Sequence, residues 1–109
     1  MNMFNVPNWN TDRIISDSTY DGNRVIQYQP GNGTNYVVIV TAIAPEHINI
    51  VGALLFISTI WPGAGSFLSG GGYFTGDYVN EKIPSLTRID AEVVAQILNH
   101  VKESGYVHS

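Results

Sequence analysis

A long segment without any charged side chain constrains the fold of this chain more than any other feature. Between His47 and Gly76 the sequence contains no Asp, Glu, Lys or Arg. The part from Ile48 to Leu68 has 21 residues, about the length of a membrane-spanning helix. It includes Pro62 and several glycines, however, and no Lys/Arg clusters flank it. Its densest apolar part, Ile50 to Ile57, has the eight-residue length of a buried strand. We therefore expect strands and no membrane span.

Strand patterns also precede this segment. Arg13 to Tyr20 indicates a short polar strand, and Arg24 to Gln29 alternates as its partner. Asp21-Gly22 between them is typical of a type I′ hairpin turn. Asn35 to Ala44 is rich in β-branched residues and apolar on both faces, so it predicts a central strand covered on both sides.

The uncharged segment itself predicts several elements. Ile48 to Ile60 indicates a second apolar strand, bent near Gly52 because an interior glycine often marks a bulge. We expect Trp61 to Gly65 to form a turn. Ser66 to Ser69 and Tyr73 to Asn80 then read as shorter strands joined by three glycines.

The C-terminal segment differs in kind, because its apolar residues recur at spacings of three and four. This periodicity predicts an amphipathic helix near residues 88–104. Thr87 and Asp90 have the spacing of a capping box at its start, and Gly105 supplies a stop. The predicted core positions are Ile89, Val93, Val94, Ile97, Leu98 and Val101.

Together these patterns predict an α+β fold. We expect an antiparallel sheet of five or six strands with one C-terminal amphipathic helix packed on one face. A length of 109 residues suits a single domain, residues 1–109, with an irregular arm at 1–10.

Composition reduces the number of functions that the chain can have. Charged residues make up 13% of the chain, against about 25% in ordinary soluble domains, so the surface gives little protection against association and we expect a homo-oligomer. A net charge of −4 with five Lys and Arg residues argues against nucleic-acid binding. The absence of cysteine excludes thiolate chemistry. The N-terminus lacks the features of a signal peptide, which favours a cytoplasmic location.

The segment 61–78 is the predicted binding surface, because it combines six of the eleven glycines with several aromatic residues. Glycine lets a partner approach the backbone, and aromatic side chains supply rigid contact area. Arg88 is added because a cation at the start of the helix could help to hold an anion. A purely structural role for these glycines, in bulges and close strand crossings, stays open. The predicted ligand-binding residues are Trp61, Ser69, Tyr73, Thr75, Asp77, Tyr78 and Arg88.

Catalytic motifs are missing. Neither a Gly-x-Ser-x-Gly elbow nor a phosphate-binding glycine motif occurs, and the three histidines are too far apart in sequence to suggest a metal site. Asp12, Asp17 and Asp21 form the one group of neighbouring carboxylates considered for acid–base work. We expect no catalytic residue, metal or cofactor.

The function that these features favour is a non-catalytic, oligomeric binding protein that captures a small polar ligand or blocks a protein partner. Chains with this composition fit phage or host-defence accessory proteins. No motif carries a family resemblance. A structural or assembly subunit is the first alternative, and a small enzyme with a carboxylate and a histidine from separate elements is the second.

Overall fold

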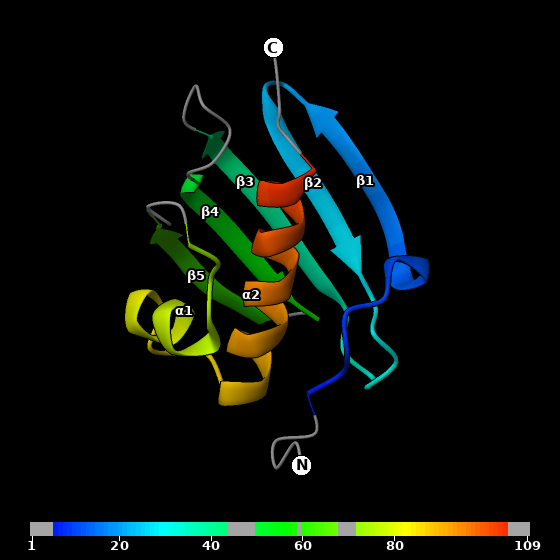
Figure 1. Ribbon diagram of the computed structural model, residues 1–109, viewed down its shortest axis with the longest axis vertical. Coiled ribbons are helices and arrows are strands. Elements are labelled where there is room, and N and C mark those ends of the chain that lie inside the picture. Colours follow the sequence, from blue (N-terminus) through cyan, green and yellow to red (C-terminus); the bar gives the residue numbers. More distant parts are fainter. Residues whose placement is uncertain (1–5, 44–49, 59, 68–71, 105–109) are drawn as a thin grey trace.

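The computed structural model describes residues 6–43, 50–58, 60–67 and 72–104. Their strands form one antiparallel sheet in which each strand pairs with the next along the chain, in the order β1-β2-β3-β4-β5 (Figure 1). The strands are β1 (Ile14–Tyr20), β2 (Asn23–Tyr28), β3 (Tyr36–Ile43), β4 (Ile50–Ile57) and β5 (Ile60–Ser66). A short 3-10 helix, Thr11–Arg13, precedes β1.

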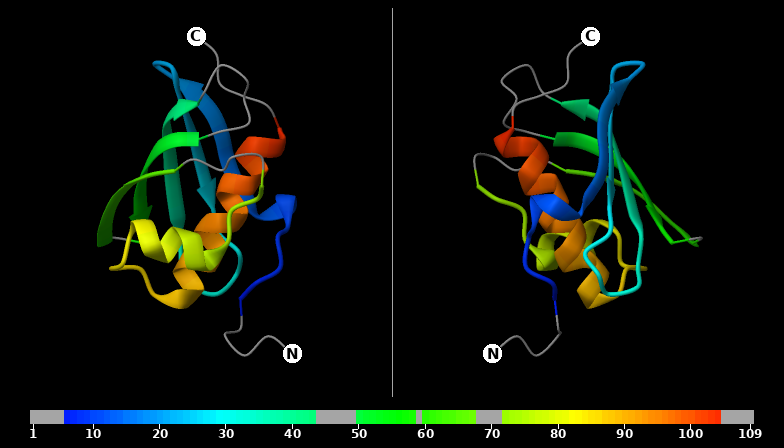
Figure 2. Two further views of the ribbon diagram at one scale, coloured as in Figure 1. Left: turned by 60° about the vertical axis from the view of Figure 1, so that its left-hand side comes forward. Right: turned by 90° about the vertical axis from the view of Figure 1, so that its right-hand side faces the viewer.

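Two helices follow the sheet, α1 (Gly76–Lys82) and α2 (Arg88–Glu103). Both lie on the same side of the sheet, and α2 crosses its middle (Figure 1), while the edge-on views show no helix on the other side (Figure 2). The residues before β1 also run along the helical side, where Gln96 Nε2 donates to the Pro7 carbonyl at 3.0 Å. The predicted α+β class, with the C-terminal helix on one sheet face, is confirmed.

Local sequence signals explain the first hairpin and the last helix. Asp21 and Gly22 both have positive φ, 53° and 80°, as a type I′ turn requires. The Thr87 side chain accepts a hydrogen bond from Asp90 N at 3.1 Å and so caps α2 as predicted. Of the predicted core positions, Ile89 is half-buried and the other five are buried, whereas Gly105 lies outside the described residues.

The core lies between the sheet and the helices. Along β2, β3 and β4 every second residue is buried, the pattern of a sheet with one covered face. This covered face packs against the apolar side of α2, and Phe67, Phe74 and Val79 close the core beside β5. Its strand residues are Ile26, Tyr28, Tyr36, Val38, Val40, Ile50, Ala53, Leu55 and Ile57.

Two predictions in the uncharged segment are wrong. The range Trp61 to Gly65 is not a turn but part of β5, which pairs antiparallel with β4. Pro62 is compatible with this assignment because β5 is an edge strand of the sheet, where a missing N–H is tolerated. The chain reverses earlier, next to Ser58, which has a φ of 55°.

The range Tyr73 to Asn80 is not a strand, because Gly76–Lys82 forms α1. Thr75 caps this helix by accepting a hydrogen bond from Tyr78 N at 3.1 Å, an N-terminal signal that the alternating reading overlooked. The predicted strand Ser66 to Ser69 is reduced to the end of β5 at Ser66, and residues 68 and 69 lie outside the described part.

The two apolar strands are confirmed with shorter bounds. The predicted irregularity near Gly52 is present, since the register of β3 and β4 shifts where Ala42 pairs with Gly52. The central position of β3 is also confirmed. Cover on both sides is not, because the face of β3 opposite the helices carries Val37 and Ile39 half-buried, without a second layer from the described chain.

Candidate functional site

The structure divides the predicted site residues between the two sides of the sheet. Tyr73, Thr75, Asp77 and Tyr78 belong to or adjoin α1 on the helical side, and Arg88 begins α2 there. Trp61 lies on β5 and contacts Phe56, with ring centroids 4.4 Å apart. Ser69 lies outside the described residues.

The helical-side residues are largely engaged with one another or with their helices. Asp77 forms an ion pair with Arg88, so the arginine that was expected to help hold an anion has a carboxylate partner within the chain. The Tyr73 hydroxyl donates to Glu103 Oε2 at 2.7 Å, and the hydroxyl of Thr75 caps α1. Tyr78 is half-buried against the core. These contacts connect α1 and its approach to α2.

Close packing explains Gly65 and Gly76 of segment 61–78, since a Cβ on Gly76 would overlap the Glu92 side chain, and backbone conformation explains Gly63. A Cβ on Gly65 would lie 2.8 Å from Phe67 Cζ and 3.1 Å from Ile83 Cγ1, so the Phe67 ring would have to move. Gly63 has a φ of 121°, which other residues rarely adopt. The structural reading of these glycines, close crossing and backbone freedom, is therefore supported at these positions.

Trp61 belongs to a different surface, the side of the sheet that no described helix covers. Strand register places Val25 and Gln27 of β2 beside Ile39 and Val37 of β3. The same rows continue to Leu54 and Phe56 of β4 and to Ala64 of β5. We call this surface the open face and define it by its apolar side chains, Val25, Val37, Ile39, Leu54, Phe56, Trp61 and Ala64.

The open face is apolar where water would normally favour polar residues. An antiparallel sheet with one solvated side usually alternates apolar inward and polar outward. Here the outward residues of β3 and β4 are mainly aliphatic or aromatic, and Phe56 and Trp61 are 39% and 49% exposed. Contiguous apolar surface of this kind marks an interaction site more often than an ordinary surface.

The described charged side chains lie outside this face or at its border. The described acidic and basic residues lie on the helices, in the turns and 3-10 helix, or, like Asp17 and Arg24, on the covered side. Lys82 approaches the border, where it shares a shallow hollow with Thr41, Leu54 and Ser66. The rim is polar instead, with Ser16, Ser18 and Asn23 on the outward side of the first hairpin.

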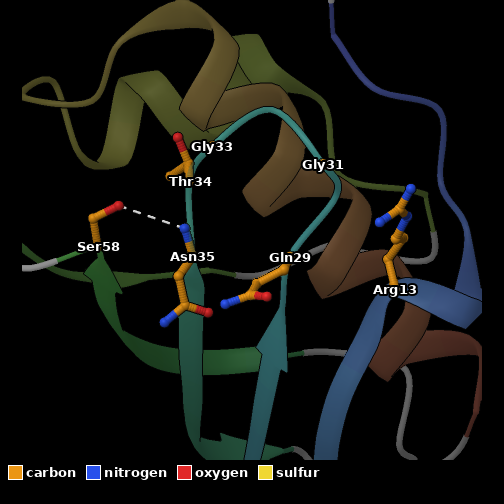
Figure 3. Close-up of a pocket in the computed structure, with 7 residues that line it drawn as sticks. All are labelled: Arg13, Gln29, Gly31, Gly33, Thr34, Asn35 and Ser58. Atoms are coloured by element: carbon orange, nitrogen blue, oxygen red, sulfur yellow. Dashed lines mark hydrogen bonds between the residues drawn. The ribbon is translucent and has the colours of Figure 1, made fainter.

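A polar pocket of about 490 Å³ lies at one end of the sheet, where the β2–β3 loop meets the β4–β5 turn and the start of β1 (Figure 3). Gly31 and Gly33 bend the loop with φ of 101° and 87°. Ser58 N donates to Asn35 O at 2.6 Å, and Asn35 N donates to Ser58 Oγ at 3.4 Å, which ties the loop to the turn.

Arg13 makes this pocket positively charged. A Cβ on Gly31 would lie 3.5 Å from the guanidinium carbon, so the charged group rests against the loop. Among the described residues that line the pocket, Arg13 is the one charged side chain, and the others supply amide, hydroxyl and backbone groups. Such a set can hold a small anion.

One histidine and one carboxylate from separate elements do meet, as the enzyme alternative requires. His100 Nε2 on α2 lies 3.5 Å from Asp17 Oδ2 on β1. The same carboxylate accepts hydrogen bonds from Arg24 Nε at 2.9 Å and Arg24 Nη2 at 2.7 Å. The hydrogen bonds from Arg24 lower the pKa of Asp17 below 3.8, although burial opposes them.

This arrangement is better suited to anchoring α2 than to catalysis. The guanidinium already neutralises Asp17, and Arg24 Nη1 also donates to Ser104 Oγ at 2.7 Å at the end of the helix. Trp9 covers the histidine, with ring centroids 5.1 Å apart. The other two considered carboxylates, Asp12 and Asp21, are exposed in the 3-10 helix and the hairpin turn.

Metal ligands do not gather in the described ranges, where no three His, Asp or Glu side chains come together. No described helix is both long and apolar enough to cross a bilayer. No protein-family model, curated protein or solved structure matches the chain, so its site rests on its own geometry.

The sequence predicted Trp61 as a site residue but not the other residues of the open face. Leu54 and Phe56 read as core because β4 is apolar on both faces, and the alternation alone does not say which face a helix covers. Arg13 had no local signal, because its pocket forms from segments that are far apart in sequence.

Proposed function

We propose that this protein is a non-catalytic binding protein that uses the open face of its sheet to hold a protein partner. The observation that carries the proposal is the combination of exposed Phe56 and Trp61 with surrounding aliphatic side chains, where Lys82 at the border is the one described charge. This binding surface is not the segment 61–78 expected from the sequence. Trp61 is the predicted site residue that the two surfaces share.

The energetics favour this use of the face. Burying apolar surface stabilises a complex by about 25 cal/mol per Å², and tryptophan is among the residues that most often dominate binding energy. The aromatic pair Phe56–Trp61 supplies such an anchor. The aliphatic residues beside it would exclude water from the contact, and the polar hairpin residues would form its rim.

Site-specific photo-crosslinking tests the proposal in cells that produce the protein. We expect p-benzoylphenylalanine in place of Trp61 to form covalent adducts with a protein partner, either another copy of this chain or a different protein. The matched control places the same group at Tyr73, which is 63% exposed on the helical side. Adducts from position 61 that do not exceed those from position 73 would contradict the proposal.

A second candidate function, capture of a small anion, is favoured by Arg13 in the loop-end pocket. The guanidinium rests beside Gly31, and the described lining residues include no carboxylate. A carboxylate or phosphate group would complement this set. The pocket lies beyond the ends of β2 and β3, next to the open face, so both kinds of binding are compatible with one molecule.

Titration with inorganic phosphate and with citrate, followed by amide NMR, tests the second candidate. We expect shifts at Gly31, Gly33 and Asn35 that saturate in the wild type and disappear in Arg13→Gln. Shifts that persist unchanged in Arg13→Gln, or none in the wild type, would remove the pocket from consideration.

A further inference from the structure

We infer that the occupant of the open face is a second copy of this chain, packed sheet against sheet about a two-fold axis. This inference rests on the proposed function and names the partner. It is carried by three properties of the face: its charge, its size and its position relative to the sheet edges.

The charge distribution permits self-association through this face and disfavours it elsewhere. Each chain carries a net charge of −4, so contact between charged surfaces of two copies would be repulsive. Among the described charged side chains, Lys82 alone reaches the border of the open face, beside Leu54 and Ala64, and the strand positions inside the face carry no charge that its own copy would repel. A surface of this kind is complementary to itself, as a two-fold interface must be.

The shape of the molecule is compatible with an interface of standard size. An interface of standard size takes about 800 Å² from each partner, and the accessible surface of this protein is 5968 Å². The molecule measures 37 × 26 × 24 Å. Figure 1 is viewed along the shortest axis and shows the sheet behind the helices, so the open face is one of the two broad sides of the molecule. A sheet-on-sheet contact could therefore reach standard size.

The two edge strands of the sheet are less suited to contact a second copy of the chain than the open face is. At one edge, β5 contains Pro62 and the positive-φ residue Gly63. At the other, the register of β1 shifts between Ile14 and Ser16. Proline and bulges are devices that prevent strands of two molecules from pairing edge to edge. Two open faces can instead stack about 10 Å apart, as sheets do in β-sandwiches.

In such a dimer, Leu54 lies between Ile39 of β3 and Ala64 of β5 and so occupies the interior of the contact. Phe56 and Trp61 lie one row further toward the turn that follows β4. The acidic helices remain on the two outer sides. Added salt should then strengthen association, because it screens the repulsion between the two negative molecules.

Sedimentation velocity of the whole chain tests the inference. From about 1 to about 100 µM, the concentration range in which moderate interfaces assemble, we expect the wild type to shift from monomer to dimer. Leu54→Asp should weaken dimerisation at least about 100-fold, because it buries two unpaired carboxylates. Phe56→Asp is the second variant, since Phe56 is 39% exposed and its replacement perturbs folding less. Tyr73→Asp adds the same charge on the helical side and should leave the dimer intact.

Far-UV circular dichroism of each variant shows whether it is folded. Dimeric wild type and Tyr73→Asp, together with a folded, monomeric Phe56→Asp, would support the inference. A wild type that stays monomeric, or a dimer that survives both open-face substitutions, would overturn it. Photo-crosslinking from position 61 then decides separately whether a different protein occupies the face, so the two proposals can fail independently.

Discussion

The two faces of the sheet are built from similar residues but have different surroundings. On β4, Leu55 points to the covered face and is fully buried, while its neighbour Leu54 points to the open face and is half-buried. On β3, Val38 and Ile39 differ in the same way. The chain supplies one helical layer for two apolar faces. This difference within the described chain is the basis of our proposal that another molecule covers the open face.

The largest expected difference between the faces comes from the adjacent leucines. Leu55→Ala should lower the free energy of unfolding by about 2–5 kcal/mol, because it leaves a cavity in a packed core. Leu54→Ala should cost the dilute monomer less than about 1.5 kcal/mol, since its site already borders solvent. Urea denaturation at low protein concentration measures both. Equal losses would mean that the two faces are equally covered within one chain.

The covered face also contains a buried tyrosine whose titration is detectable. Burial, helped by a hydrogen bond to Asp90 Oδ1 at 2.8 Å, raises the pKa of Tyr36 from 10.0 to about 12. The unfolded chain loses this proton near pH 10 and the folded chain does not. The free energy of unfolding should therefore be unaffected below pH 10 and fall between pH 10 and about 12, by about 2–3 kcal/mol.

Tyr36→Phe should remove this part of the alkaline loss, measured by urea denaturation at several pH values. Tyr20→Phe is the matched control, because Tyr20 is 75% exposed at the hairpin. An alkaline profile that is the same for the wild type and Tyr36→Phe would contradict the account of the covered face.

The contact between the first hairpin and α2 should respond to acid. Because the folded-state pKa of Asp17 is lowered from 3.8, its contribution is present above that value and lost as pH falls through the folded value. Asp17→Asn should cost about 1–3 kcal/mol near pH 7, the range for hydrogen bonds to charged groups. The difference from the wild type should shrink below about pH 4. Asp21→Asn, in the exposed turn, serves as control; a difference that does not change with pH would exclude the ionised contact.

The smallest effect is expected from the predicted site residue Asp77. Its ion pair with Arg88 is exposed, with 78% and 38% of the two side chains accessible, so Asp77→Ala should cost less than about 1 kcal/mol. The cost should vanish in about 1 M NaCl, where screening is strong. Thermal melts at low and high salt measure it. A large loss of stability that does not depend on salt would contradict the assignment of this ion pair as an exposed, weak contact.

How much the sequence predicted depends on whether the signal was local. The period of α2, its Thr87 cap and the Asp21-Gly22 turn are each set by neighbouring residues, and all were found. Segment 61–78 was misread because its glycines and aromatics resemble alternating strands, while the Thr75 cap that starts α1 was overlooked. Continuous apolar runs predicted β3 and β4 as strands but not which face the helices cover, so Leu54 and Phe56 could not be separated from the core.

Hydroxyl-radical footprinting of the wild type tests most directly whether the open face is a binding surface. It reports labelling of Phe56 and Trp61 in one sample, with Tyr73 on the helical side as internal reference. The account predicts that Phe56 and Trp61 become protected as protein concentration rises, or in cells where a partner is present, while Tyr73 stays equally reactive. Labelling of Phe56 and Trp61 that never falls relative to Tyr73, in concentrated protein or in cells, would contradict it.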